Sequence, residues 1–478
     1  MRTRTVVERF VRFLTGEPSG DAESGGGPPH SKTLSRLPAA STSRQRLGVR
    51  QSSGAFTALL LATACSLLAA ESDWPRFRGP NGSGLAPGAQ PPTTWSDTQN
   101  VKWKTELPGP GTSSPILVGD RVFVTCWTGY GVTKGKSALS RELVCVDRAS
   151  GKVKWTRAVA GETPADQFEG YLPEHGYASH TPTSDGERVF VYLGRGGAAA
   201  FDLDGKQLWH VQLGDRANGK NWGSAASPVL YKDTVIITAS EEAHAVVALD
   251  KKTGKEVWRA PGAALEYVFG TPALAGSATA PELVFALPEE LWALNPDTGK
   301  LRWFATTGLP GNIAPSVVVG EGVVFAFGGF PQLGAVAVKT GGKGDVSSSH
   351  RLWSTRNSTY VPTPVLHEGR LYVVTDQGFA LCLDAKTGEQ VFKERLPGAS
   401  ATGRGGKPFY ASAVLANGNF YAVSRRNGTF VMEAKPQFKL VAQNSFAGDS
   451  TQFNATPAVS GKELFLRSEK FLYCVATQ

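Results

Sequence analysis

The sequence predicts an all-β fold: an eight-bladed β-propeller of four-stranded antiparallel blades, in which strands from the two ends of the chain pair and close the ring. Three observations predict it. One hairpin motif recurs at near-constant spacing, a second motif precedes each copy, and each end of the chain carries half a hairpin. The 55 glycines and 30 prolines among 478 residues also suit many short strands and turns.

The hairpin is clearest at residues 246–258, which read VVALDKKTGKEVW. An apolar run ends at Leu249, and Asp250 can accept backbone N–H bonds in the turn. Gly254 can take the positive φ that a tight turn often demands. Trp258 lies on the return strand and brings a large apolar side chain. A lone hairpin is marginal in water, so its recurrence is the informative feature.

Each copy of the hairpin ends on an aromatic residue or a leucine. These end residues are Trp103, Trp155, Trp209, Trp258, Trp303, Trp353, Phe392 and Leu440, spaced 39–54 residues apart. That spacing suits one four-stranded blade per copy. The copy before Trp353 is interrupted by an insert at 341–349. Residues 472–478 carry only the first half of a hairpin and residues 100–107 only the second, so their pairing completes the eighth blade and removes a free edge.

A proline-marked strand precedes each hairpin. The clearest copy, residues 114–124, reads SPILVGDRVFV. Because proline has no N–H, it belongs at the start or the edge of a strand, and we expect it to begin the innermost strand beside a central channel. The outer strand with its tryptophan is expected to pack against the neighbouring blade. The markers are Pro115, Pro182, Pro228, Pro272, Pro315, Pro364 and Pro457, with Ala413 in the seventh repeat.

Charge and cysteine content argue against several functions. Nine of the 50 Lys and Arg and four of the 41 Asp and Glu lie in residues 1–70, so the remaining 41 and 37 nearly balance and form no dense basic run. We therefore expect no nucleic-acid partner. The five cysteines form no CxxC motif, which argues against a zinc or redox site. Cys145, Cys382 and Cys474 occupy the repeat position of Ala248, where we expect small buried residues.

The chain divides into four expected parts. Residues 1–48 are rich in Arg, Ser, Gly and Pro, which predicts a disordered leader. We expect Met1 to be a misassigned start and the true start to lie nearer Val49. Residues 49–70 resemble a secretory signal peptide whose apolar run is short for a membrane span, so no transmembrane segment is expected after cleavage. Residues 71–99 predict an irregular lead-in strap and residues 100–478 the propeller. Cys65 weakly matches a lipidation signal, so a lipid anchor is the alternative to plain cleavage near Ala70.

The motif ALDKKTGKEVW at 248–258 resembles the pyrroloquinoline-quinone (PQQ) repeat, and the resemblance runs from about Trp74 to the C-terminus. It implies an eight-bladed propeller. The family includes quinoprotein alcohol and glucose dehydrogenases and also non-catalytic propellers, among them the propeller lipoprotein of the outer-membrane β-barrel assembly machinery. Residues 73–80 also resemble the lead-in of exported propellers of this group, which implies a strap packed on the ring. The resemblance is specific for fold and unspecific for activity.

The resemblance implies what a dehydrogenase would need: an Asp base beside the quinone, Glu, Asn and Asp ligands for calcium, and in one branch an adjacent-cysteine disulfide. No Cys-Cys pair, calcium-ligand motif or long catalytic insert is evident. We therefore expect an exported non-catalytic propeller without metal or cofactor. It would serve as a protein–protein interaction scaffold for envelope proteins or as a ligand-binding module, including an extracytoplasmic sensor. The alternative is a PQQ-dependent dehydrogenase of alcohols or sugars that uses PQQ and calcium.

The loops that enter the innermost strands are the candidate ligand site, because propellers bind where blade loops converge. Their polar and aromatic side chains suit stacking and hydrogen bonding. The candidate residues are His175, Tyr177, His180, Asn221, Trp222, Glu266, Tyr267, Asn312, Tyr360, Lys407, Tyr410, Gln452 and Asn454, with Thr112, Ser113, Thr359 and Arg404 beside them.

Local motifs within these loops are weaker signals. Residues 174–180 contain two histidines and a carboxylate that could hold a metal, but a spacing of five on a glycine-containing loop defines no geometry. Residues 194–197 have no helix behind them, so phosphate binding is not expected. The loop 403–407 is expected to be flexible, with positive charge that could face an anionic ligand. No Ser/His/Asp or Cys/His nucleophile arrangement can be argued from spacing alone.

Overall fold

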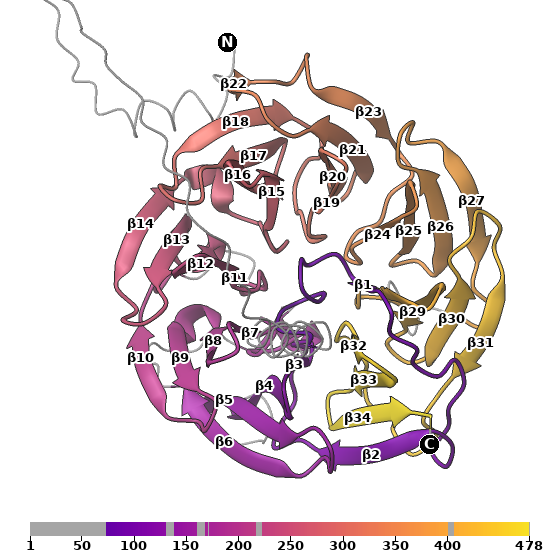
Figure 1. Cartoon of the computed structure of the whole chain (residues 1–478). Coiled ribbons are helices and arrows are strands. Elements are labelled where there is room, and N and C mark those ends of the chain that lie inside the picture. Colours follow the sequence, from indigo (N-terminus) through magenta and orange to yellow (C-terminus); the bar gives the residue numbers. More distant parts are fainter. Residues whose placement is uncertain are drawn as a thin grey trace, which may run out of the picture. The chain divides into compact units, whose positions relative to one another are not determined.

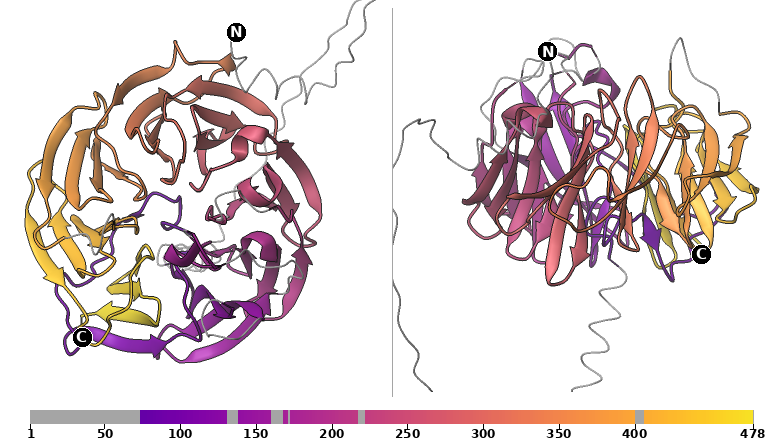
Figure 2. Two further views of the ribbon diagram at one scale, coloured as in Figure 1. Left: turned by 180° about the vertical axis from the view of Figure 1, so that it is seen from behind. Right: turned by 90° about the horizontal axis from the view of Figure 1, so that it is seen from above.

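Eight blades stand in chain order around a central axis (Figure 1). The computed structural model describes residues 73–130, 138–159, 168–170, 172–216, 222–399 and 406–477, all within the unit Ser72–Gln478. In each blade the first strand lies nearest the axis and the fourth on the rim, and edge-on the ring is a thick disc (Figures 1 and 2). The predicted eight-bladed all-β propeller is confirmed. The expected leader, the signal peptide with Cys65, Asn221 and Arg404 lie outside the described residues.

The first four blades follow the lead-in. Blade 1 is β3 (Ile116–Val118), β4 (Arg121–Gly129), β5 (Leu139–Asp147) and β6 (Val153–Val159). Blade 2 is β7 (Thr183–Ser184), β8 (Arg188–Tyr192), β9 (Ala198–Asp202) and β10 (Gln207–Val211). Blade 3 is β11 (Val229–Tyr231), β12 (Thr234–Ala239), β13 (Ala245–Asp250) and β14 (Glu256–Pro261). Blade 4 is β15 (Ala273–Ser277), β16 (Ala280–Leu287), β17 (Glu290–Leu294) and β18 (Leu301–Thr306), to which β22 (Gly344–Asp345) adds a parallel outer strand.

The other four blades complete the ring. Blade 5 is β19 (Val318–Gly320), β20 (Val323–Gly328), β21 (Gly334–Lys339) and β23 (Arg351–Thr355). Blade 6 is β24 (Val365–His367), β25 (Arg370–Val374), β26 (Phe379–Asp384) and β27 (Gln390–Arg395). Blade 7 is β28 (Val414–Ala416), β29 (Asn419–Val423), β30 (Thr429–Glu433) and β31 (Leu440–Asn444). Blade 8 is β32 (Ala458–Ser460), β33 (Glu463–Arg467), β34 (Phe471–Ala476) and β2 (Val101–Glu106).

Short helical turns lie in the loops, at η1 (Leu172–Glu174), η2 (Gly194–Gly196), α3 (Ser240–Ala243) and η3 (Ala263–Leu265). In the described part of the chain, no helix has the length and apolar character needed to span a membrane.

The two ends of the chain share blade 8. Strand β2 pairs antiparallel with β34, and Trp103 lies opposite Cys474 in the register. The prediction that residues near 100–107 and 472–478 close the ring is therefore confirmed. Because the ring is closed, each blade packs between two neighbours, and both faces of its sheet are covered.

The hairpin turns join neighbouring blades. At residues 246–258, Asp250 Oδ1 accepts backbone N–H bonds within the turn at 2.8 and 3.0 Å, and Gly254 has φ of +71°. Trp209 of the preceding blade lies on this turn, where its Nε1 donates to Lys251 O at 2.9 Å and a Cβ on Gly254 would come within 2.8 Å of the indole. Corresponding indole-to-carbonyl bonds are made by Trp103, Trp155, Trp258 and Trp353. The predicted packing of the outer strand on the next blade is thus confirmed.

Three blades depart from this pattern. In blade 6 the residue is Phe392, which has no N–H to donate and packs against Phe438 of blade 7. In blade 4 the insert at 341–349 supplies β22, and Val346 N donates to Phe304 O at 2.9 Å, so that Trp303 is completely buried under the insert. In blade 7 the register places Ala442 opposite Val431, where the other blades have tryptophan or phenylalanine. The sequence-based marker Leu440 was therefore two residues out of register, because the apolar pattern of this copy does not reveal its β-bulge.

The cysteines of the repeat are core residues, as predicted. Cys145, Cys382 and Cys474 are buried opposite Trp155, Phe392 and Trp103, respectively, and are free thiols. Burial raises the pKa of Cys145 to about 12 and that of Cys382 to about 11, because an apolar core disfavours the thiolate.

The lead-in, drawn in indigo, runs from blade 1 past the axis to blades 6 and 7 (Figure 1). Trp74 exchanges backbone hydrogen bonds of 3.1 and 2.9 Å with Leu117 of β3. Farther along, the buried Arg78 donates to Thr363 O at 2.9 Å and to Pro364 O at 2.5 Å in blade 6. Strand β1 (Leu85–Ala86) then pairs parallel with β28 of blade 7. The lead-in thus spans the channel and holds blades 1, 6 and 7 together.

Candidate functional site

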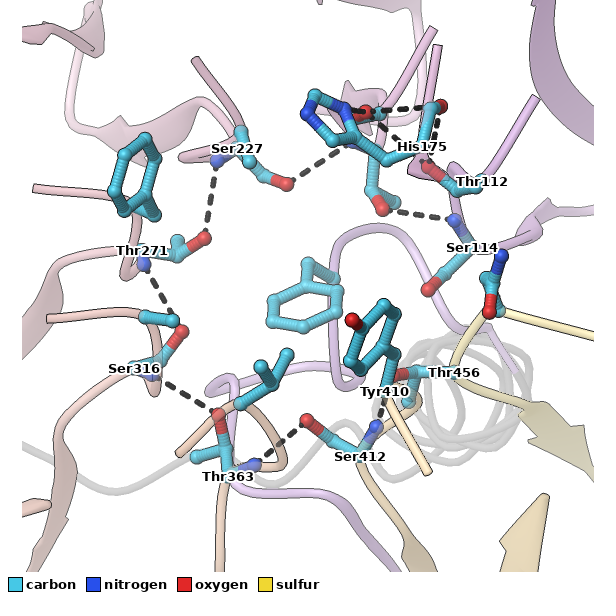
Figure 3. A pocket seen from close by; sticks show the side chains of 18 of the residues that line it. Thr112, Ser114, His175, Ser227, Thr271, Ser316, Thr363, Tyr410, Ser412 and Thr456 are labelled. Carbon is cyan, nitrogen blue, oxygen red and sulfur yellow. Dashed lines mark hydrogen bonds between the residues drawn. The ribbon is translucent and has the colours of Figure 1, made fainter. Parts of the chain in front are cut away.

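A cavity of about 400 Å³ lies on the axis, where the loops entering the innermost strands converge (Figure 3). All eight blades contribute to its wall through the residue two positions before the first strand. Phe77 of the lead-in lines it as well. The cavity therefore forms only when the ring is closed and the lead-in is in place.

A ring of hydroxyl side chains encircles the cavity. We call it the hydroxyl ring; its members are Ser114, Thr181, Ser227, Thr271, Ser316, Thr363, Ser412 and Thr456. From Ser114 onward, the backbone N–H of each member donates to the hydroxyl oxygen of the next at 2.9–3.0 Å, as far as Thr456 (Figure 3). These bonds satisfy buried N–H groups and fix the spacing of the blades at the axis.

The sequence carried a signal for the hydroxyl ring that the analysis of prolines missed. In six blades the ring member directly precedes proline, as in Ser114-Pro115. In blade 5 the ring member is Ser316, so Val317 holds the place of proline and Pro315 lies two residues too early. The proline marker was therefore wrong in that blade, because the hydroxyl residue is the constant feature.

One side of the cavity is aromatic. Trp222 and Phe269 lie with ring centroids 5.8 Å apart, and Phe330 and Tyr360 with centroids 4.8 Å apart. These rings come from the loops ahead of blades 3, 4 and 6 and from within blade 5. Such surfaces bind flat or apolar groups by stacking and by burial of area.

Another part of the wall is polar and charged. Lys407 Nζ lies 2.9 Å from Oδ2 of Asp376, which is 1% exposed. Beside it, Arg425 lies 4.3 Å over the Tyr410 ring and forms an ion pair with Glu174 at 2.5 Å. Burial raises the pKa of Tyr410, so its phenol stays protonated at neutral pH. A ligand here would meet hydrogen-bonding groups whose charges are already paired.

His175 and Ser179 contact each other in the cavity wall. Ser179 Oγ lies 2.6 Å from His175 Nδ1, and His175 Nε2 lies 2.5 Å from the backbone carbonyl of Trp222. Thr112 Oγ1 lies 3.2 Å from Ser179 Oγ. Burial lowers the pKa of His175 below its usual value, which favours the neutral imidazole. Ser179 was not among the sequence-based candidates, because a serine in a loop carries no signal of its own.

The structure divides the thirteen candidate residues between the cavity and its surroundings. His175, Trp222, Tyr360, Lys407, Tyr410 and Asn454 line the cavity, as does Thr112. Six others lie outside its lining: Tyr177, His180, Glu266, Tyr267, Asn312 and Gln452. Asn221 is outside the described residues. Ligand binding by any of them stays a prediction.

The candidates outside the lining have structural contacts. Tyr177 belongs to the core of blades 1 and 2, and the His180 ring packs edge-on against Tyr192 with centroids 4.8 Å apart. Gln452 contacts Arg425, and Asn312 Nδ2 reaches the Tyr360 hydroxyl at 3.5 Å. The 174–180 segment therefore separates its two histidines, one into the cavity wall and one into the core.

Calcium and PQQ are the groups implied under the dehydrogenase alternative. Calcium requires six to eight oxygen ligands, usually including carboxylates. Glu174 is the carboxylate among the cavity-lining residues, and Arg425 already pairs with it. Among the described residues, no three His, Cys, Asp or Glu side chains are grouped to hold a metal ion. These residues do not fit a calcium–quinone centre.

Comparison with known proteins places this fold in a family. The family described as outer membrane protein assembly factor BamB matches residues 131–287, 270–394 and 345–435. No curated protein is similar in sequence to this chain.

Solved structures share the fold at low identity. BamB from Moraxella catarrhalis has a TM-score of 0.54 and 13% identity, over 78% of this chain and 96% of that one. A europium-containing methanol dehydrogenase has a TM-score of 0.57 and 11% identity, over 86% of this chain and 100% of that one. The quinohemoprotein alcohol dehydrogenase of Comamonas testosteroni has a TM-score of 0.55 and 13% identity, over 87% of this chain and 82% of that one. Because a BamB protein and two dehydrogenases match equally well and at low identity, these likenesses show the fold alone. The family match covers more than half of the chain, so the protein belongs to the BamB family of PQQ-repeat β-propellers.

Proposed function

We propose that this protein is an exported ligand-binding propeller whose axial cavity holds a small molecule. The observation that carries the proposal is the cavity itself: about 400 Å³, aromatic on one side and hydrogen-bonding on the other. Small-molecule sites in proteins are typically concave, mostly apolar and of about 300–1,000 Å³. The cavity lies within that range.

The cavity is built to be rigid before any ligand arrives. The hydroxyl ring ties the blade entrances together, and the Arg78 contacts hold the lead-in against blade 6. A preformed site loses little conformational entropy on binding, which favours affinity for a small ligand. A surface that served only as a scaffold would gain nothing from such an enclosed space.

Oxidation of alcohols or sugars with PQQ and calcium is the second candidate, favoured by the fold shared with two dehydrogenases. The single, ion-paired carboxylate of the cavity argues against it. Export rests on the signal-like segment at 49–70, and the likeness to BamB supports other envelope proteins as partners of the outer surface.

Thermal unfolding of the chain from residue 71 onward tests the proposal. The probes are PQQ with calcium, benzyl acetate, 2-phenylethanol and glucose, each titrated at several concentrations. We expect an aromatic probe to raise the melting temperature, since a ligand at 100 times its Kd stabilises by about 2.7 kcal/mol. Dye-linked oxidation with PQQ and calcium is measured alongside.

Trp222→Ala should weaken binding of the aromatic probe about tenfold, because it removes a stacking surface from the wall. Val257→Ala, on the exposed rim, is the control and should bind normally. Stoichiometric PQQ binding with turnover would establish the dehydrogenase instead. A failure of every aromatic probe to shift the melting temperature would remove the ligand site.

A further inference from the structure

The contact between Ser179 and His175 has a defined direction. A carbonyl oxygen only accepts, so the 2.5 Å contact with Trp222 O requires the hydrogen on His175 Nε2. In the neutral imidazole, Nδ1 is then an acceptor, and the 2.6 Å contact is a bond donated by the Ser179 hydroxyl. The hydroxyl hydrogen of Ser179 therefore points at the basic Nδ1 of His175, and the Trp222 carbonyl holds the imidazole in place.

We propose that Ser179 is a nucleophile, His175 its general base and the Trp222 carbonyl the orienting group, for acyl transfer from a small aromatic or apolar ester in the axial cavity. The inference rests on the proposed function, since the ester must first bind there. A nucleophile beside a base that a third group orients is the shared arrangement of unrelated acyl-transfer enzymes. Ser179 and His175 both line the cavity and are only partly buried, so a ligand can reach them.

The aromatic side of the cavity indicates the substrate class. Trp222, whose carbonyl orients His175, also presents its side chain to the cavity beside Phe269. A phenyl or similar ring stacked there would hold the attached ester close to the loop that carries Ser179. An ester is preferred to an amide because an alkoxide is a better leaving group than an amide anion and so depends less on protonation by the imidazolium.

Hydrogen-bond donors for the developing oxyanion are available in the same wall. The seven members of the hydroxyl ring from Thr181 to Thr456 accept a backbone N–H. Within the described part of the chain, none of these hydroxyls has an acceptor for its own hydrogen. Thr181 is two residues from Ser179, and Ser114 and Thr112 lie beside His175 (Figure 3). Donors placed before the reaction stabilise charge that forms only in the transition state.

The reaction balances with water as the only co-reactant. Ser179 Oγ bonds to the acyl carbon while its proton moves to His175 Nδ1. The ester C–O bond breaks, and the leaving oxygen takes that proton and departs as an alcohol. Water then attacks the acyl-serine, gives a proton to Nδ1, and releases the carboxylic acid as the proton returns to Oγ.

Two other serine–histidine contacts show what is particular to Ser179. Ser224 Oγ lies 3.0 Å from His180 Nε2, but it donates to Glu242 Oε1 at 2.5 Å and is buried outside the cavity lining. Its hydrogen therefore does not face a base. Ser349 Oγ lies 2.9 Å from His350 Nδ1 on the surface insert, away from any wall that could hold a substrate. This second pair provides a matched control.

Phenylmethylsulfonyl fluoride, a small aromatic reagent for activated serines, tests the proposal. Intact-mass measurement should show one added group, and peptide mapping should place it on Ser179. Ser179→Ala should abolish the label, and His175→Gln should slow labelling about 10²–10⁴-fold, the usual contribution of a general base. Ser349→Ala should label at the wild-type rate. Hydrolysis of 4-nitrophenyl acetate should follow the same order.

Melting temperatures and circular dichroism establish that each variant is folded. If Ser179→Ala does not fold, Ser179→Cys replaces it, and its alkylation by chloroacetamide should depend on His175 in the same way. Absence of label on Ser179, or equal labelling of the His175→Gln variant, overturns the proposal. Ligand-induced melting shifts without labelling would leave the proposed function standing and remove only this inference.

Discussion

The rim and the axis of the ring are made from the same eight repeats, yet they differ in what the repeats carry. On the rim, Trp103, Trp209, Trp258 and Trp353 are each 8–9% exposed and each donate to a backbone carbonyl of the next blade. At the axis, only the hydroxyl ring repeats, and the loops around it present a different side chain from each blade. Repetition therefore marks architecture, and the differences between repeats mark the candidate site.

The largest effect is expected from removing the rim contact that closes the ring. Deletion of residues 100–107 takes away β2 and the Trp103 contact with blade 1. Loss of a buried tryptophan alone costs about 3–5 kcal/mol, and typical domains are stable by only about 5–15 kcal/mol. We expect loss of the cooperative thermal transition. Lys102→Ala, an exposed change in the same strand, should melt almost normally; a normal transition after the deletion would show that the termini do not share a blade.

A single rim tryptophan should also matter more for folding than a cavity aromatic. Trp258→Ala removes a side chain that packs on Gly299 and donates to Pro296 O, so unfolding in urea should lose about 3–5 kcal/mol. Its neighbour Val257, 51% exposed, should tolerate alanine within about 0.5 kcal/mol. If Trp258→Ala were as mild as Val257→Ala, the rim contacts would not be what joins the blades.

The lead-in tests whether the axis has an architectural element of its own. Arg78→Met removes a buried guanidinium that donates to the carbonyls of Gly82, Ser83, Thr363 and Pro364. Leaving buried acceptors unpaired costs about 1–3 kcal/mol each, so we expect at least about 3 kcal/mol less stability in urea. Arg259→Met, at a partly exposed rim position, should cost under about 1 kcal/mol. Equal effects of the two changes would argue that the lead-in is not anchored by Arg78.

The smallest effect concerns the pH dependence of the two histidines in the loop ahead of blade 2. Burial lowers the pKa of His180 to about 3, from an ordinary 6.5, and also lowers that of His175. Below pH 6.5, His180 is protonated in the unfolded chain and stays neutral in the folded protein. The free energy of unfolding therefore falls as the pH falls. Between pH 6.5 and 5 this loss is about 2 kcal/mol for His180. His180→Gln should flatten the decline in melting temperature over that range by a corresponding amount.

His350→Gln, on the insert of blade 5, is the control for that measurement. The melting temperature of this variant should decline between pH 6.5 and 5 as steeply as that of the wild type. An unchanged slope in the His180→Gln variant would mean that His180 is protonated in the folded protein, and hence that the core between blades 2 and 3 admits water.

The architecture can be predicted from the amino-acid sequence, because each hairpin is a local pattern. Asp250, Gly254 and Trp258 identify a turn and its outer strand within thirteen residues, and the half-hairpins at the two ends predict how the ring closes. The prediction from local pattern was wrong in two copies. It missed Ala442 as the outer-strand residue of blade 7 and Ser316 as the residue that starts blade 5. It placed the candidate site in the right loops, since these are what a propeller brings to its axis.

Which side chains contact each other in the cavity wall depends on how the blades pack in three dimensions. His175 contacts a carbonyl 47 positions away, and Arg425 pairs with Glu174 across 251 positions. Such contacts depend on the rotation from blade to blade and on ring closure, and no local pattern encodes them. Whether a loop side chain faces the cavity or the core is likewise set by packing against neighbouring blades, as the separation of His175 and His180 shows.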